Sequence, residues 1–215
     1  MERWILDGNT PARRVFVMAH GAGAPMDAPF MNEVAGAIAG RDLAVVRFEF
    51  PYMATRRREG SRRPPDRMPA LEAAYLEVLD GLRARGVLNP RTRRPQLSIG
   101  GKSMGGRVAS HLADAVGADA LVCLGYPFHP PGKPDRRRTA HLEDLQTPTL
   151  IVQGTRDPFG RPDEVESYAL SPRIAVHWIE DGDHSFKPRM SSGRTEADTR
   201  VDAAGAIRRF LDALA

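Results

Sequence analysis

A serine on a sharp turn is the residue of this chain best suited to do chemistry. Gly101, Ser103 and Gly105 fit the pattern G-x-S-x-G, in which the serine lies on a strained turn between a strand and a helix. An apolar run, 97–99, precedes the turn, and a helix-like segment, 107–116, follows it. The glycines allow close backbone approach, so the hydroxyl is exposed above the edge of a sheet. The pattern predicts a nucleophile; a plain strand-to-helix turn with a serine N-cap is the alternative.

Two downstream residues could supply the base and the acid that a neutral serine hydroxyl needs. Asp157 follows the apolar run 149–153, and His184 follows the next strand-like run, 174–179. Both are expected on loops at the same sheet edge as Ser103, in the chain order Ser, Asp, His. We predict that His184 is the general base, because imidazole titrates near neutrality, and that Asp157 orients it and stabilises the imidazolium.

Two other acids stand close to the histidine and remain alternatives for the orienting role. Asp181 and Asp183 lie within three residues of His184, too near in sequence to orient its ring easily. A role in turns explains these two aspartates better. The alternative for His184 itself is a histidine on a surface turn.

Backbone N–H groups able to bind a developing negative charge are expected at two turns. Met104, directly after the serine, supplies one such donor. The small-residue turn 20–24 leaves further N–H groups uncovered, and Ala22 is the preferred donor with Gly23 as the alternative. His20, the first residue of this turn, is expected to shape the turn and to border the substrate pocket rather than to react.

Three segments, 20–23, 101–107 and 125–134, resemble those of α/β hydrolases, and the resemblance extends from Val15 to the C-terminal helix. Within that superfamily they resemble a small, cap-poor branch similar to dienelactone hydrolases, to testis-expressed protein 30 and to subunit 3 of the NSL complex. The resemblance implies a carboxylic-ester hydrolase working through an acyl-enzyme, and it fixes no substrate. A thioesterase or acyl transferase would use the same groups. A hydrolase-like scaffold that binds partners through basic loops is the alternative from another class.

Two basic segments, about 51–69 and about 126–141, follow strands and should emerge at the active-site edge. Tyr126, Phe128 and His129 in the second segment are expected to line the substrate pocket. The arginines of the two segments are Arg56, Arg57, Arg58, Arg62, Arg63 and Arg67 in the first, and Arg136, Arg137 and Arg138 in the second.

Three interpretations of these arginines are open. They could form a solvated surface, a rim that attracts anionic substrates, or a nucleic-acid surface. Nucleic acid is the least favoured partner, because aromatic residues that stack on bases are scarce near them. A small-molecule ester is the expected partner, and the oligomeric state is not predicted. The stretch 51–69 lacks periodicity and is predicted to be a mobile lid.

Length and composition indicate one α/β domain over 1–215 without a large cap. The chain is 41% hydrophobic and 27% charged, with a net charge of +4, which is ordinary for a soluble protein. The single cysteine, Cys123, cannot form a disulfide within the chain and fits a cytoplasmic location. We expect no membrane span, no metal site and no cofactor. The richness in Arg, Ala, Pro and Gly is typical of a GC-rich bacterial genome.

The apolar pattern predicts alternating strands and helices. The strands should form a mostly parallel central sheet with helices on both faces. Val201, Ala204, Ile207 and Leu211 form a stripe at helical spacing that should face the core. The predicted strands span 15–18, 43–48, 97–100, 120–124, 149–153 and 174–179, and the predicted helices span 28–39, 68–85, 105–116, 163–168 and 196–214.

Overall fold

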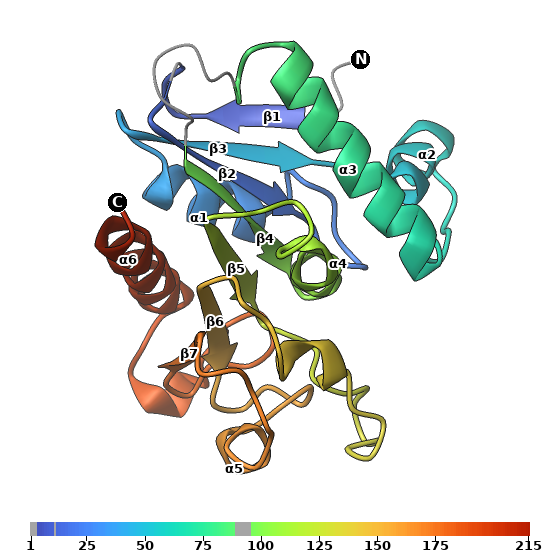
Figure 1. Ribbon diagram of the computed structural model, residues 1–215. Coiled ribbons are helices and arrows are strands. Elements are labelled where there is room, and N and C mark those ends of the chain that lie inside the picture. The colour runs from blue at the N-terminus through green and yellow to red at the C-terminus, as the bar shows by residue number, and fades with distance from the viewer. Residues whose placement is uncertain (1–3, 11, 89–95) are drawn as a thin grey trace.

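A seven-stranded sheet forms the centre of the molecule, which a computed structural model describes over residues 4–10, 12–88 and 96–215 (Figure 1). The strand order is β1-β3-β2-β4-β5-β6-β7, with β1 antiparallel to β3 and the other neighbours parallel. The predicted single domain over 1–215 includes residues outside the described part and stays a prediction. The strands are β1 (Trp4–Asp7), β2 (Arg14–Ala19), β3 (Leu43–Phe48), β4 (Gln96–Lys102), β5 (Ala120–Leu124), β6 (Thr149–Gly154) and β7 (Ile174–Ile179).

The sheet has the mostly parallel architecture predicted from the near-continuous apolar strands. Every residue of β2, β3 and β6 is buried, as expected for strands that are covered on both faces. The register places Lys102 of β4 beside Leu124 of β5, and Leu124 beside Val152 of β6. The carboxyl ends of these strands therefore meet at one edge of the sheet, from which the loops that could do chemistry emerge.

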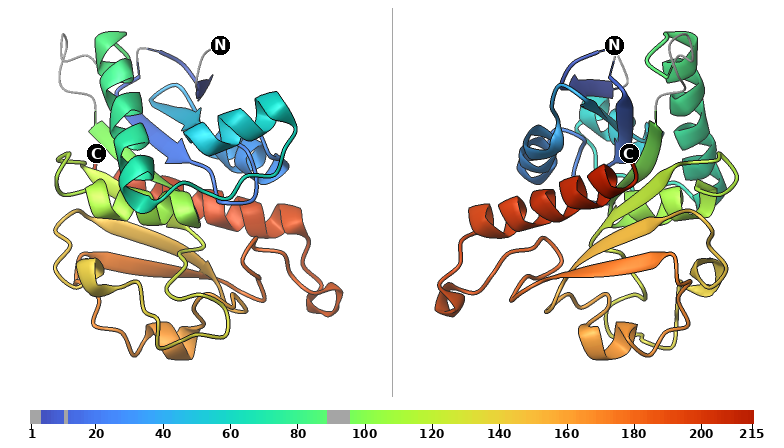
Figure 2. Two further views of the ribbon diagram at one scale, coloured as in Figure 1. Left: turned by 90° about the vertical axis from the view of Figure 1, so that its right-hand side faces the viewer. Right: turned by 60° about the vertical axis from the view of Figure 1, so that its left-hand side comes forward.

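Helices cover both faces of the sheet, as predicted (Figures 1 and 2). On one face α1 and α6 enclose an apolar core that includes Ile207, and on the other α3 and α4 enclose a core that includes Leu79. The edge that carries the loops holds only short helices and, in the part described, no separate cap domain. The helices are α1 (Pro29–Ile38), α2 (Pro51–Glu59), α3 (Met68–Ala84), α4 (Met104–Leu112), η1 (Ala140–Leu142), α5 (Pro162–Val165), η2 (Met190–Ser192) and α6 (Glu196–Ala213).

The prediction of a long irregular lid over 51–69 is wrong for its first half. Pro51 starts α2, where its fixed φ suits the first helical turn, and Gly60 ends the helix in a left-handed conformation at φ 66°. Only Tyr52 and Met53 of this helix are buried, and the run of arginines behind them has no apolar period. Periodicity could therefore not reveal the helix.

Two further differences concern single elements. β1 was not predicted, because it is a four-residue strand whose only sheet partner is β3. Val201 was predicted to face the core, yet it is 69% exposed on α6. The other three members of that stripe are buried, so the buried face of α6 is narrower than the apolar pattern indicates.

Replacing Gly100 of β4 by alanine is expected to lower the free energy of unfolding, because a Cβ there would lie 1.9 Å from the carbonyl oxygen of Val122. Overpacking of this kind costs about 1–3 kcal/mol. Gly36 of α1 is the matched control, since a Cβ at that position meets nothing within 4 Å. Glycine-to-alanine inside a helix stabilises by about 0.5–1 kcal/mol. Urea denaturation of Gly100→Ala and Gly36→Ala measures both, and a shift of the same sign in the two variants would contradict this packing.

Candidate active site

Ser103 lies between the last residue of β4 and the first residue of α4, with φ 51° and ψ −111°. This is an unfavourable conformation for a residue with a side chain. The backbone around it is held on both sides: the Ser103 N–H donates to the carbonyl of Leu124 over 2.9 Å, and the Ser103 carbonyl accepts from the N–H of Arg107 over 3.0 Å. A Cβ at Gly101 or Gly105 would lie 2.2 or 2.5 Å from the carbonyl oxygen of Ala19, so both positions require glycine.

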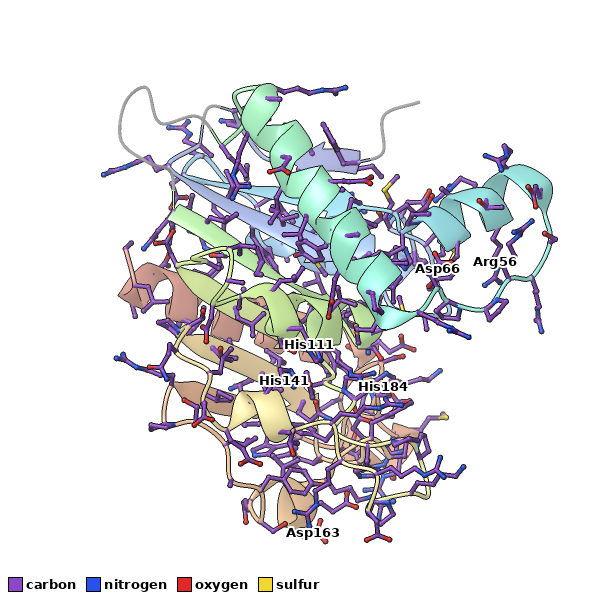
Figure 3. The ribbon with its side chains drawn as sticks, turned by 45° about the vertical axis from the view of Figure 1, so that its right-hand side comes forward. Arg56, Asp66, His111, His141, Asp163 and His184 are labelled. Carbon is purple, nitrogen blue, oxygen red and sulfur yellow. The ribbon has the colours of Figure 1, made fainter. Side chains whose placement is uncertain are left out.

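The structure brings together the three side chains predicted to act as nucleophile, base and acid. The Oγ atom of Ser103 lies 2.9 Å from Nε2 of His184, and Nδ1 of His184 lies 2.8 Å from Oδ2 of Asp157. The Asp157 side chain is fully buried, whereas the His184 side chain, labelled in Figure 3, is 24% exposed. A single line of hydrogen bonds thus runs from the interior to a hydroxyl at the surface.

The Asp157 carboxylate is fixed by two further donors. Its Oδ2 accepts from Nε2 of Gln153 over 3.0 Å, and its Oδ1 accepts from the N–H of Phe159 over 2.9 Å. The alternative acids have other partners. Asp181 binds the Arg189 side chain over 2.7 Å, and Asp183 accepts from backbone N–H groups of its own loop. Of the three candidate acids, only Asp157 reaches the imidazole.

Burial of His184 lowers its pKa, and the nearby Lys102 ammonium acts in the same direction, while Asp157 opposes both. The imidazole is therefore neutral at neutral pH. In that state Nδ1–H donates to Asp157 and the Nε2 lone pair accepts from the Ser103 hydroxyl, which is the tautomer that a general base requires.

Lys102 was not predicted to belong to this site, although it is the residue directly before the serine. Its Nζ donates to the backbone carbonyl of His184 over 2.7 Å and lies 5.6 and 5.9 Å from the ring centroids of Phe30 and Phe186. Burial lowers the pKa of Lys102 to about 8. The lysine therefore ties the loop of the base to the strand of the serine and places a positive charge behind the imidazole.

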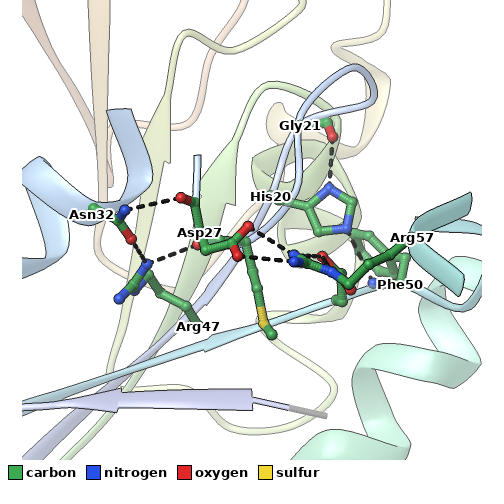
Figure 4. A network of polar contacts seen from close by, with 9 residues as sticks. His20, Gly21, Asp27, Asn32, Arg47, Phe50 and Arg57 are labelled. Atoms are coloured by element: carbon green, nitrogen blue, oxygen red, sulfur yellow. Dashed lines mark hydrogen bonds and ion pairs between the residues drawn. The ribbon is translucent and has the colours of Figure 1, made fainter. Parts of the chain in front are cut away.

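The turn 20–24 is oriented by the imidazole of His20, which Figure 4 shows within a larger polar network. The N–H of Phe50 donates to Nε2 of His20 over 3.1 Å, so the proton of this ring is on Nδ1, which donates to the Gly21 carbonyl over 2.6 Å. The hydroxyl of Tyr52 donates to the Ala22 carbonyl over 3.0 Å. Because an amide N–H points opposite to its carbonyl, the N–H groups of Ala22 and Gly23 face away from these side chains.

The helix α2 that carries Tyr52 is itself anchored beside this turn. Arg57 donates to both carboxylate oxygens of Asp27 over 2.7 and 2.9 Å and to Glu49 over 2.6 Å. Part of the first basic segment therefore serves to hold the turn rather than to form a free rim.

The four residues predicted to line the substrate pocket lie inside the protein. His20, Tyr126 and Phe128 have no exposed surface, and His129 is 2% exposed. The Tyr126 hydroxyl donates to the backbone carbonyl of Arg138 over 2.9 Å, so these side chains hold the loop in place. Tyr126, Phe128 and His129 belong to the second basic segment, which contains buried apolar residues as well as arginines.

Phe159 is a residue at the site that sequence reasoning missed. Its ring lies 4.3 Å from the imidazole of His184, measured between centroids, and is only partly buried. It shields one face of the imidazole from water. Its position two residues after Asp157, in the same loop, was the available signal.

Comparisons with known proteins give the family and the fold of the chain. The family described as an alpha/beta hydrolase domain matches residues 12–212. The chain belongs to this family. An alpha/beta serine hydrolase without lid from Xanthomonas campestris is 22% identical, with 96% of this chain and 88% of that chain covered and a TM-score of 0.71. Dienelactone hydrolase from Anabaena variabilis is 20% identical, with 96% and 89% covered and a TM-score of 0.70.

The fold of this α/β hydrolase is thus shared with a serine hydrolase that has no lid and with a dienelactone hydrolase, as the predicted cap-poor branch requires. Among the described residues, no group of three or more His, Cys, Asp and Glu side chains is arranged to hold a metal ion. None of the helices in the described part combines the length and apolar character needed to cross a membrane.

The pKa of His184 is expected to lie below its ordinary value of about 6.5 and to rise in Lys102→Met. The lysine charge disfavours the imidazolium, so its removal makes protonation easier. NMR titration of the imidazole resonances measures this shift. Lys187→Met is the control, because Lys187 is an exposed lysine of the same loop, paired with Glu196 over 3.3 Å. An unchanged or lower pKa in Lys102→Met would refute the electrostatic role.

Proposed function

We propose that this α/β hydrolase cleaves small carboxylic esters through an acyl-enzyme. Ser103 is the nucleophile, His184 the general base and acid, and Asp157 the residue that orients the imidazole. The observation that carries the proposal is the unbroken line of hydrogen bonds from Ser103 Oγ through His184 to a carboxylate that is fully buried. The positive φ of Ser103 also supports the proposal, because backbone strain of this kind clusters at functional sites.

The reaction then proceeds in two halves. Ser103 Oγ attacks the ester carbonyl carbon while its proton passes to His184 Nε2. The imidazolium gives this proton to the departing alcohol oxygen as the carbon–oxygen bond breaks, which leaves an acyl ester on the serine. Water attacks the acyl carbon and gives a proton to His184. That proton returns to Ser103 as the acid is released.

The negative oxygen of each tetrahedral intermediate is bound by backbone N–H groups. In this proposal Met104 supplies one donor, at the first position of α4, and Ala22 the other, with Gly23 as the alternative. Neither Ala22 nor Gly23 donates a backbone hydrogen bond to another residue of the described part. Both N–H groups are therefore free to bind an oxyanion, and losing one such donor typically costs about 3 kcal/mol of transition-state stabilisation.

Stopped-flow kinetics with p-nitrophenyl esters of increasing acyl length test this function. Wild type should release a burst of p-nitrophenol equal to the enzyme concentration, and Ser103→Ala should lose activity by a factor of about 10⁶ while remaining folded. A matched thioester series separates thioesterase activity, and added alcohols separate acyl transfer.

The absence of turnover on every ester, together with no labelling of Ser103 by a fluorophosphonate, would overturn the proposal. The protein would then act as a hydrolase-like scaffold that binds partners through its basic segments. Pull-down with wild type and Ser103→Ala distinguishes this case, because a scaffold binds equally well without the serine hydroxyl.

Tyr52→Phe is expected to lower kcat by about three- to tenfold, since one hydrogen bond to the turn that presents Ala22 is lost. KM should change less, because an oxyanion exists only in the reaction and not in the bound substrate. Tyr168→Phe is the control, as the Tyr168 hydroxyl makes no hydrogen bond to other described residues. Equal loss of kcat in both variants, or a change in KM alone, would contradict the proposed role of Tyr52.

A further inference from the structure

Phe159 places an aromatic ring directly beside the proposed general base. The centroid of this ring lies 4.3 Å from that of the His184 imidazole, with 34° between the two ring planes. Phe159 is only partly buried, whereas Tyr126 and Phe128, the aromatic residues of the neighbouring loop, have no exposed surface. Phe159 therefore combines contact with the imidazole and apolar surface that a substrate can reach.

The backbone of Phe159 is fixed by the same carboxylate that orients the base. Its N–H donates to Oδ1 of Asp157 over 2.9 Å, and its carbonyl accepts from the N–H of His129 over 3.2 Å. Gly160, the next residue, leaves no room for a side chain, because a Cβ there would lie 2.5 Å from the ring of the buried Phe128. The backbone that carries the ring is thus held in place before a substrate binds.

The loop that carries this ring offers no free charge to a substrate. Residues 155–160 include two charged side chains, those of Arg156 and Asp157. Arg156 donates to the backbone carbonyl of Asp181 over 2.8 Å and lies 3.6 Å from its carboxylate, while Asp157 is bonded to the imidazole. Pro158, the residue before the phenylalanine, is exposed and apolar. The surface that this loop presents to a substrate is therefore mainly apolar.

The chemistry of the proposed reaction decides which part of an ester comes near this surface. Nε2 of His184 gives its proton to the alcohol oxygen, which must then lie within about 2.6–3.2 Å of that nitrogen. The carbonyl oxygen is instead bound by the turn 20–24, where a Cβ at Gly21 would lie 3.7 Å from Cβ of Ser103. Because the alcohol group is attached to the oxygen at the imidazole, it is the part of the substrate that comes nearest to Phe159.

We propose that Phe159 is a specificity-determining residue that contacts the alcohol group of the ester and favours an aromatic alcohol. Its role rests on the proposed ester hydrolysis and defines the alcohol half of the substrate. Aromatic rings attract each other in offset or edge-to-face arrangements with centroids about 4.5–7 Å apart. A phenyl group next to the imidazole also removes apolar surface of Phe159 from water. Aryl esters of small carboxylic acids are therefore the substrate class that fits this site.

The test compares phenyl acetate with hexafluoroisopropyl acetate, two esters whose alcohols are similar in acidity and of which only the first is aromatic. The measured quantity is the ratio of their kcat/KM values, each divided by the rate constant for hydrolysis by hydroxide. Wild type should favour the phenyl ester. Phe159→Leu should lower the ratio by about three- to tenfold, the loss expected when an aromatic pair is removed. Phe159→Tyr keeps the ring and should keep the ratio.

A ring that merely shields the imidazole gives a different result. His184 acts on both esters alike, so loss of shielding would change the two kcat/KM values equally, and an unchanged ratio in Phe159→Leu would overturn the proposal. The pair p-nitrophenyl acetate and p-nitrophenyl butyrate varies the acyl group instead. Phe159→Leu should leave the ratio of this pair at the wild-type value, and an equally large fall there would overturn the assignment to the alcohol.

Tyr168→Leu is the matched control. Tyr168 is also a partly buried aromatic residue, but it packs against Phe128, with the ring centroids 5.7 Å apart, rather than against the imidazole. The ratio of the phenyl and hexafluoroisopropyl esters should stay at the wild-type value in this variant. An equal fall in Tyr168→Leu and Phe159→Leu would overturn the proposal in favour of a general effect of losing an aromatic ring.

Failure of the ester chemistry itself is distinguishable. If neither acetate is turned over, phenol is titrated into Ser103→Ala while the imidazole resonances of His184 are followed by NMR. Phenol should bind more weakly, by about threefold or more, when Phe159→Leu is added to this variant. Equal affinity, or the absence of phenol binding, overturns the alcohol site, whatever the activity of the protein.

Discussion

Ser103 holds its backbone at φ 51° and ψ −111°, where an L-residue is disfavoured, and the surrounding structure has to enforce this conformation. The two strands on either side of β4 enforce it. β2 approaches so closely that Gly101 and Gly105 cannot carry a side chain, and β5 accepts the Ser103 N–H through Leu124. Gly106 leaves the space that β5 needs at Cys123. The order of the sheet, with β4 between β2 and β5, is therefore inseparable from the position of the serine hydroxyl.

Local sequence patterns were sufficient to predict the parallel strands that hold the serine turn in place. The parallel strands are buried on both faces, so their apolar runs stand out, and their observed bounds differ from the predicted ones by at most two residues. The loops of the serine, the aspartate and the histidine could be predicted because each residue lies within five positions of the end of such a run. Residues that act through distant partners could not be placed. Lys102 has its role through the carbonyl of His184, and Tyr52 through the carbonyl of Ala22, contacts that no local pattern encodes.

The segments between the strands were harder to predict because their charge conceals their apolar content. The second basic segment buries Tyr126, Phe128 and His129, so residues predicted to meet a substrate instead fix the loop. In the first segment α2 rests on two buried side chains, and Arg57 bonds to Asp27 and Glu49. A count of arginines treats all of them alike. Only the distribution of acidic partners separates those that stabilise loops from those left unpaired.

A site without a cap domain has to limit water with its own neighbouring side chains. Phe159 covers one face of the His184 ring, and the buried Lys102 closes the space behind the loop of the histidine. Burial of the imidazole and the positive charge of Lys102 both lower the pKa of His184, so the base stays neutral and ready to accept a proton. This arrangement buries the Lys102 ammonium beside two aromatic rings, with an uncharged carbonyl as its hydrogen-bond partner among the described residues. Since desolvation alone disfavours such a charge, the negative charges of Asp157 and Asp183 help to stabilise the lysine ammonium, which in turn holds the loop of His184 through its carbonyl.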